Sequence, residues 1–152
     1  AIELTELLNG TICFITVKTK DTIAIEKEFN FNGTVMIFHD QVHQVMINIF
    51  TNAIEAIESS SDSGNGLIKI TTNPIKVDNK EFVEIEVYNS GPEVSEEELL
   101  KIFEPFYTTK VTEMNSGLGL SVAYTTIKKH KGFIEAKNSD HGFSIIVKLP
   151  LQ

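Results

Sequence analysis

The chain of 152 residues is poor in cysteine, in basic residues and in long apolar runs. Its one cysteine, Cys13, excludes a disulfide framework, which fits a reducing compartment. We expect its thiol to be buried, and we expect a cytoplasmic location even where a parent protein is anchored in a membrane. No apolar run approaches the roughly 20 residues that cross a bilayer. Thirteen Lys and Arg against 21 Asp and Glu give a formal charge of −8, which argues against nonspecific binding to nucleic acid.

The residues that are present suffice for one folded domain. A chain of this length buries a substantial core, and a hydrophobic content of 41% is ordinary for a globular protein. We therefore predict a single domain over residues 1–152. The chain has no initiator methionine and starts within a helix-like segment, so we expect it to be a part cut from a longer protein.

Hydrophobic periodicity predicts a mixture of helices and strands. Helices are predicted over residues 4–15, 40–58 and 117–129 and in a short acidic segment after residue 95. Strands are predicted over residues 22–29, 35–38, 67–72, 82–88, 133–137 and 143–149, with a turn at 78–80. Thr5, Asp40 and Ser95 are predicted helix caps, Ser95 with Glu98 as a capping box, and Gly132 is predicted to end the last helix. Neighbouring strands joined by turns favour a mixed or antiparallel sheet with helices on one face, an α/β (α+β) two-layer sandwich.

The most informative segment is K-I-F-E-P-F-Y-T-T-K-V-T-E-M-N-S-G-L-G-L-S, residues 101–121. An aromatic cluster at residues 103–107 is followed by a polar stretch with one lysine, Lys110, and then by the glycines of residues 117–119. These glycines open a helical pattern in which Leu118, Val122 and Ile127 share a face. Glycines at the start of a helix expose backbone N–H groups, and the helix dipole favours an anion there. The segment therefore predicts a nucleotide phosphate site under a mobile lid, against the plainer alternative of a loop that precedes a helix.

The long helix predicted over residues 40–58 carries a polar stripe opposite its apolar face. The apolar face consists of Val42, Val45, Met46, Ile49, Phe50, Ala53 and Ile57. The polar stripe consists of Gln41, Gln44, Asn48, Asn52 and Glu55. Asparagine is a poor residue for a helix interior, so two of them one turn apart invite an explanation. Two interpretations stay open: a solvated face, or amide oxygens that suit a hydrated Mg²⁺ ion with phosphates.

Three sequence motifs resemble those of one family. F-E-P-F-Y-T-T-K followed by G-L-G-L-S is similar to the F box and second glycine box of the ATP-binding catalytic domain of bacterial sensor histidine kinases, in the superfamily of gyrase, histidine kinases and MutL-type proteins. Q-V-M-I-N-I-F-T-N-A-I-E-A-I resembles the N box of the same family. The resemblance covers about residues 5–149. It implies the Bergerat-type ATP-binding fold, a two-layer sandwich, with ATP and Mg²⁺ as ligands.

The resemblance also implies the roles of individual residues. It places Asn52 on the metal and Asn48 beside it, orienting phosphates or water, while Glu55 stays open as a surface charge. It lets Lys110 reach β- or γ-phosphate oxygens as the lid closes. It makes Phe103 an anchor of the lid. Phosphates are expected at the backbone of Gly117, Leu118, Gly119 and Leu120.

The segment expected to bind adenine departs from the family pattern. Residues 89–94 read N-S-G-P-E-V, where the family has Asp-x-Gly-x-Gly, so Asn89 replaces the aspartate, Gly91 is kept and Glu93 replaces the second glycine. A neutral acceptor in place of a charged one costs about 1–2 kcal/mol, or roughly ten- to thirtyfold in affinity. The glutamate adds bulk and negative charge near an anionic ligand. Two interpretations compete: a weak but working ATP site, or a degenerate (pseudo-kinase) interaction module.

None of the four histidines resembles a phospho-acceptor, since the residues after His39-Asp40 do not match that motif. The resemblance therefore implies the catalytic domain of a two-component sensor histidine kinase, which transfers a phosphoryl group to a histidine on a separate helical hairpin (dimerisation) domain. A response regulator receiver domain would act downstream. The full-length parent is expected to be a homodimer and the isolated domain a monomer. An anti-sigma-factor serine kinase of the same superfamily is the alternative, which the aromatic F-box phrase disfavours.

Overall fold

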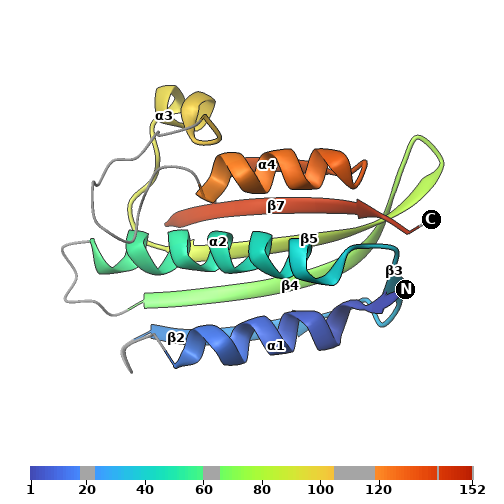
Figure 1. Cartoon of the computed structure of the whole chain (residues 1–152). Coiled ribbons are helices and arrows are strands. Elements are labelled where there is room, and N and C mark those ends of the chain that lie inside the picture. Colours follow the sequence, from blue (N-terminus) through green and yellow to red (C-terminus); the bar gives the residue numbers. More distant parts are fainter. Residues whose placement is uncertain (18–22, 60–65, 105–118, 140, 152) are drawn as a thin grey trace.

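The computed structural model describes residues 1–17, 23–59, 66–104, 119–139 and 141–151. Along the chain these form β1 (Ile2–Glu3), α1 (Leu4–Thr16), β2 (Ile23–Phe29), β3 (Thr34–Val35), α2 (His39–Glu58), β4 (Gly66–Val77), β5 (Lys80–Ser90), α3 (Glu96–Lys101), α4 (Gly119–Lys129), β6 (Phe133–Ser139) and β7 (Gly142–Pro150). Strands β2, β4, β5, β7 and β6 make one sheet in that order (Figure 1). Strand β2 pairs with β4 in parallel, and the other neighbours in this sheet are antiparallel. The predicted mixed sheet is confirmed.

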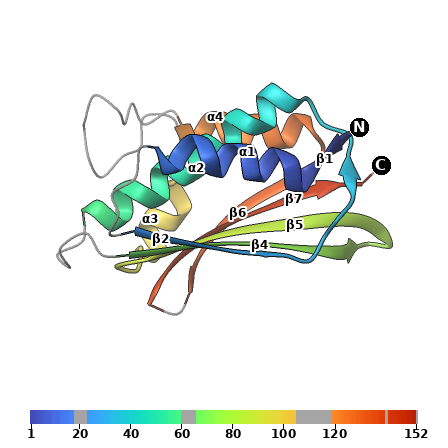
Figure 2. The same ribbon diagram turned by 90° about the horizontal axis from the view of Figure 1, so that it is seen from below.

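Helices α1, α2 and α4 cover one face of the sheet, which confirms the two-layer sandwich (Figure 2). Alternation along β5 explains this packing, because Val83, Ile85 and Val87 are each at most 2% exposed and belong to the core beneath the helices. The core face of α2 is the predicted one, since all seven of its apolar residues are buried.

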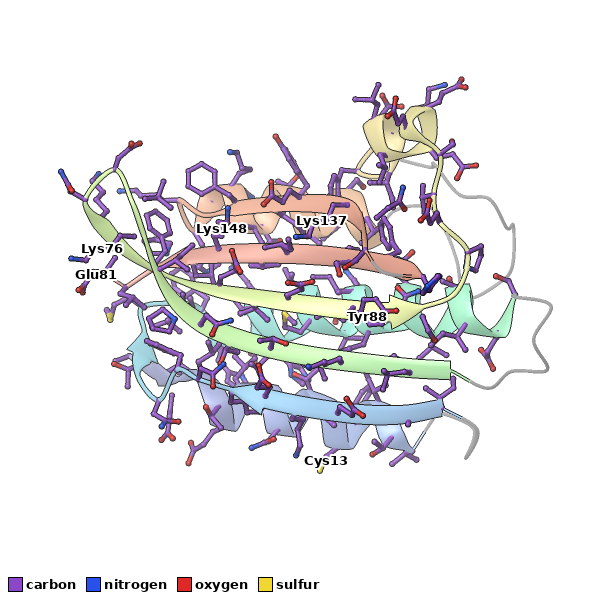
Figure 3. The ribbon with its side chains drawn as sticks, turned by 180° about the vertical axis from the view of Figure 1, so that it is seen from behind. Cys13, Lys76, Glu81, Tyr88, Lys137 and Lys148 are labelled. Carbon is purple, nitrogen blue, oxygen red and sulfur yellow. The ribbon has the colours of Figure 1, made fainter. Side chains whose placement is uncertain are left out.

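The opposite face of the sheet is partly polar. It carries Tyr88, Lys137 and Lys148 (Figure 3). Lys148 Nζ lies 3.3 Å from Glu135 Oε1 across the β6–β7 pair. Such a face needs no second layer of helices, which suits a sheet with one covered side.

Strands β4 and β5 are longer than the sequence predicts and meet in a tight hairpin. Asp78 and Asn79 have φ values of 50° and 67°, so the turn is a two-residue connection rather than residues 78–80. The strand predicted over residues 35–38 is wrong in extent, because β3 is Thr34–Val35 and pairs with β1, a strand that the sequence did not predict.

Helix capping matches the sequence at one of three positions. Ser95 caps α3, and its Oγ accepts from the Glu98 N–H at 3.1 Å. The prediction for Asp40 is wrong because α2 begins at His39 after Phe38, and Asp40 lies in its first turn. The prediction for Thr5 is also wrong, because α1 begins at Leu4 after Glu3 and the Thr5 hydroxyl donates to a carbonyl elsewhere.

Three smaller predictions fail for identifiable reasons. Gly132 was predicted to end α4, but the residue with the left-handed backbone conformation after the helix is Lys131, which has a φ of 62°. Gly132 instead lies where an added Cβ would collide with the Lys148 carbonyl oxygen. Val122 is 48% exposed and Ala123 is buried in its place, whereas Ile127 is buried as predicted. Cys13 is exposed on α1 rather than buried. Among the described residues, no helix is long and apolar enough to span a membrane.

Candidate nucleotide-binding site

The polar stripe of α2 meets the start of α4 through Asn48. Its Nδ2 donates to the Gly119 carbonyl oxygen at 3.1 Å, across 71 positions of the chain. Its Oδ1 accepts from Gln44 Nε2 at 3.0 Å. The two predicted walls of the site, the amides of α2 and the glycine that opens α4, therefore lie against each other.

The Asn48 amide is used at both ends in this arrangement, so its direct structural effect is to fix the first turn of α4. An added Cβ at Gly119 would lie 3.6 Å from Asn48 Cγ, which is an ordinary contact. Packing against α2 therefore does not by itself require glycine at this position. A residue without a side chain leaves the helix start open to an approaching ligand.

The C-terminal half of α2 contacts the end of β5. Gly91 has a φ of 136°, a conformation open almost only to glycine, and an added Cβ there would lie 3.9 Å from the Ala56 carbonyl oxygen. Asn89 precedes it on β5, on the core side of the sheet, and is 2% exposed. Its Nδ2 donates to the Ser90 carbonyl oxygen at 3.1 Å. The residues expected to face adenine thus adjoin the same helix as Gly119.

Asn48 and Ala56 are eight residues apart, which at 1.5 Å per residue is about 12 Å along α2. Asn52 lies between them, one turn beyond Asn48, and is partly exposed, as is Glu55. Figure 1 shows the end of β5 and the beginning of α4 at the same end of the molecule, opposite the β4–β5 hairpin. The structure therefore brings together Asn48, Asn52, Asn89, Gly91 and Gly119 around one helix.

The aromatic anchor is described only in part. Phe103 is partly buried against the core, and its ring centroid lies 5.8 Å from that of Tyr124 on α4. This packing suits an anchor better than a base contact. Leu120 also packs its side chain against the core. The predicted site residues Lys110, Gly117 and Leu118 lie outside the described residues.

Glu93, the residue that replaces a family glycine, is exposed. Its neighbour Val94 is held by a residue that the sequence did not single out. Asn138 on β6 contacts the backbone of Val94 with both ends of its amide. A single asparagine near the end of a strand carries no signal in one sequence, so only the fold reveals this contact.

The amide oxygens of α2 suit a cation that keeps most of its water better than one held by protein ligands alone. Within the part of the chain that the structure describes, no group of three His, Cys, Asp or Glu residues could hold a metal ion. Mg²⁺ commonly keeps several waters and takes only one or two protein oxygens together with those of the phosphates. The Asn52 side chain on the exposed stripe fits that donor set.

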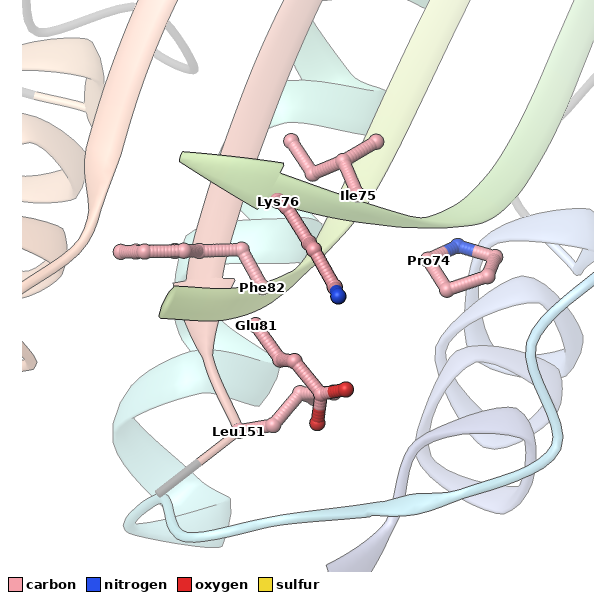
Figure 4. A pocket seen from close by; sticks show the side chains of 6 residues that line it. All are labelled: Pro74, Ile75, Lys76, Glu81, Phe82 and Leu151. Atoms are coloured by element: carbon pink, nitrogen blue, oxygen red, sulfur yellow. The ribbon is translucent and has the colours of Figure 1, made fainter. Parts of the chain in front are cut away.

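A separate pocket lies at the far end of the sheet. It has a volume of about 240 Å³ and is lined by Pro74, Ile75, Lys76, Glu81, Phe82 and Leu151 (Figure 4). Phe82 and Asn89 are seven residues apart on β5, so this pocket lies roughly 23 Å along the strand from the adenine end. None of the predicted site residues lines it.

Comparison with known proteins identifies the family. Residues 38–152 match the histidine kinase-, DNA gyrase B- and HSP90-like ATPase family. The nucleotide-free catalytic domain of histidine kinase ThkA superposes with a TM-score of 0.84 at 33% identity, covering 99% of this chain and 93% of that one. ThkA in complex with response regulator protein TrrA matches at 32% identity and a TM-score of 0.81, covering 99% of this chain and 41% of that one.

Two curated relatives extend the comparison. Sporulation kinase E of Bacillus subtilis (strain 168) is 36% identical over 114 residues, 74% of this chain and 14% of its own length. Sensor histidine kinase ZraS of Escherichia coli (strain K12) is 28% identical over 155 residues, 99% of this chain and 31% of its own length. The chain thus spans less than a third of either relative. The predicted fold and kind of protein are confirmed: the chain belongs to the histidine kinase-, DNA gyrase B- and HSP90-like ATPase family, as a catalytic domain of the sensor histidine kinase kind.

Proposed function

We propose that this chain binds Mg-ATP along α2, between the end of β5 and the start of α4, and presents the γ-phosphate to a histidine on a separate helical hairpin domain. The contact that carries the proposal is the hydrogen bond from Asn48 to the Gly119 carbonyl oxygen, 3.1 Å long. It joins the two motifs that the site needs, and Gly91 reaches the same helix at Ala56.

Each part of the site has a separate task in this proposal. Asn89 and Gly91 receive the adenine end. Asn52 offers its amide oxygen to Mg²⁺, which would neutralise phosphate charge when bound. Asn48 fixes the first turn of α4, which begins at Gly119. The backbone N–H groups of Gly117 and Gly119 bind the phosphates in this proposal. Lys110 adds a positive charge near the β- and γ-phosphates.

Transfer breaks the bond between the γ-phosphorus and the β–γ bridging oxygen and forms a bond from phosphorus to a histidine nitrogen, leaving ADP. Phosphoryl transfer depends mainly on positioning and charge stabilisation, so the residues named here act by holding the nucleotide in line with the acceptor. The acceptor histidine belongs to another domain in this proposal.

One relative supports a partner of the response regulator kind. ThkA is solved in complex with response regulator protein TrrA. We infer that a receiver domain takes the phosphoryl group from the histidine hairpin partner of this chain too. We also propose that the parent protein is a homodimer, that this chain is cytoplasmic and that the isolated chain is a monomer.

The test is calorimetric titration of the whole chain with Mg-ATP. We expect one site per chain, with weaker binding in EDTA and in Asn52→Ala. Asn9→Ala is the matched control, because Asn9 lies on α1 and its Oδ1 accepts from Lys27, away from the site. A chain that binds no nucleotide at millimolar Mg-ATP would instead be the degenerate interaction module, for which the uncharged Asn89 and the acidic Glu93 are the main arguments.

A further inference from the structure

The segment that joins β5 to α3 is held by the β6–β7 strand pair. The Gly91 N–H donates to the His141 carbonyl oxygen at 3.1 Å. The Val94 N–H donates to Asn138 Oδ1 at 2.8 Å, and Asn138 Nδ2 donates to the Val94 carbonyl oxygen at 2.7 Å. Two anchors three residues apart therefore fix the chain between Gly91 and Val94.

The Asn138 contact is specific to a primary amide. A primary amide has a carbonyl oxygen and an N–H group side by side, so it can satisfy both the N–H and the C=O of one backbone residue, as a neighbouring strand would. An aspartate would keep the acceptor and oppose the Val94 carbonyl with a second oxygen. A serine has one short hydroxyl and could not reach both groups. The geometry therefore favours asparagine over aspartate and serine at this position.

The register links this contact to the adenine end of the site. Asn138 lies opposite Phe143 on β7, and Phe143 lies opposite Asn89 on β5. Residues in such a row share one face of the sheet, here the face that the helices cover. Two strand spacings place Asn138 about 10 Å from Asn89. The residue that fixes Val94 is thus in the same row as the residue expected to accept from adenine.

We infer that Asn138 is a positioning residue for base recognition, which acts by fixing the segment from Gly91 to Val94 against the β6–β7 pair. The inference rests on the proposed function, since it assigns the base to the end of β5. Asn138 contacts the backbone of Val94, and its effect on the nucleotide passes through Gly91 and Asn89. Loss of the contact releases the segment, and the adenine amine then loses a fixed partner.

The test is a thermodynamic cycle that compares two changes, the replacement of Asn138 in the chain and the removal of the exocyclic amine from the nucleotide. The whole chain and its Asn138→Ala and Asn138→Ser variants are titrated with Mg-ATP. Purine riboside triphosphate, which lacks the amine, is measured by competition against ATP. We expect Asn138→Ala to weaken ATP about tenfold, the effect of one or two lost hydrogen bonds, and to weaken the analogue much less. The preference for the amine then shrinks at least threefold. Asn30→Ala, which removes an exposed bond to Asn73, is the control and leaves the preference unchanged.

The outcomes separate the two claims. If both ligands weaken equally in Asn138→Ala, or neither weakens, the residue is structural only and the inference fails while the proposed function stands. Asn138→Ser decides the matter if Asn138→Ala does not fold, because a retained preference for the amine in that variant also overturns the inference. Absence of ATP binding in the unsubstituted chain overturns the proposed function itself.

Discussion

Replacement of Asn89 by aspartate, the residue that the family pattern has there, should destabilise the free chain and tighten its binding of Mg-ATP. In the free chain Asn89 is 2% exposed, and its Nδ2 donates to the Ser90 carbonyl oxygen at 3.1 Å. An aspartate cannot donate that bond, and it puts a buried carboxylate beside a carbonyl oxygen. An unsatisfied buried group costs about 1–3 kcal/mol. For a domain of this size, 1 kcal/mol corresponds to roughly 2–4 °C, so the melting temperature without ligand should fall by about 2–12 °C.

The effect of the same substitution on ATP affinity should be favourable. A charged acceptor for the adenine amine is worth about 1–2 kcal/mol more than a neutral one, or a ten- to thirtyfold lower Kd. Because a ligand that binds only the folded state adds stability as its concentration rises above Kd, saturating Mg-ATP should raise the melting temperature of Asn89→Asp more than that of the unsubstituted chain.

The assay is thermal unfolding with and without Mg-ATP, with calorimetry for Kd. Asn73→Asp is the matched control, since the Asn73 side chain accepts from Asn30 Nδ2 and an aspartate accepts equally well. The reasoning is refuted if Asn89→Asp leaves the ligand-free melting temperature unchanged and fails to tighten ATP binding.

Three further predictions follow from single contacts. Asn48→Ala removes the hydrogen bond to the Gly119 carbonyl oxygen and should lower the affinity for Mg-ATP about tenfold, as measured by calorimetry. An unchanged affinity would mean that the start of α4 is not part of the binding site. Gly91→Ala forces a side chain into a φ of 136° and should cost about 1–3 kcal/mol in chemical denaturation, against no change if the backbone relaxes freely. His130→Ala removes the ring nitrogen that accepts from the Phe38 N–H at 3.2 Å and should cost about 1 kcal/mol with ATP affinity kept, so a loss of affinity instead would contradict a purely structural contact.

Local patterns were enough for most of the fold. The alternation of β5 and the apolar stripe of α2 each follow from periods of two and 3.6 residues, and both are seen in the structure. Cys13 shows what happens when residue type is preferred to period. The buried residues of α1 include Ile12 and Ile15, and position 13 turns away from that stripe, so periodicity alone would have placed the thiol outside.

Contacts between distant segments were beyond one sequence. The parallel pairing of β2 with β4 depends on how the intervening chain crosses over, and the β1–β3 pair is too short to leave a pattern. The capping predictions for Thr5 and Asp40 failed, because a capping residue type within the first turn of a helix looks the same in sequence as one at its boundary.

The candidate site divides in the same way. The motif resemblance indicated Asn48 and Gly119 as members of one site, whereas their hydrogen bond across 71 positions required the structure. Asn138 had no motif, no periodic partner and no unusual neighbour, so its contact with Val94 is visible only once β6 and the segment before α3 are placed together.

The most direct measurement of the central claim is the change in backbone amide NMR shifts as Mg-ATP is added to the chain. The account predicts the largest changes at Asn52, Gly91 and Gly119, which surround α2, and none at the β4–β5 turn of Asp78 and Asn79. Shift changes confined to residues that line the distant pocket, such as Lys76 and Phe82, with none in α2 or at the start of α4, would contradict it.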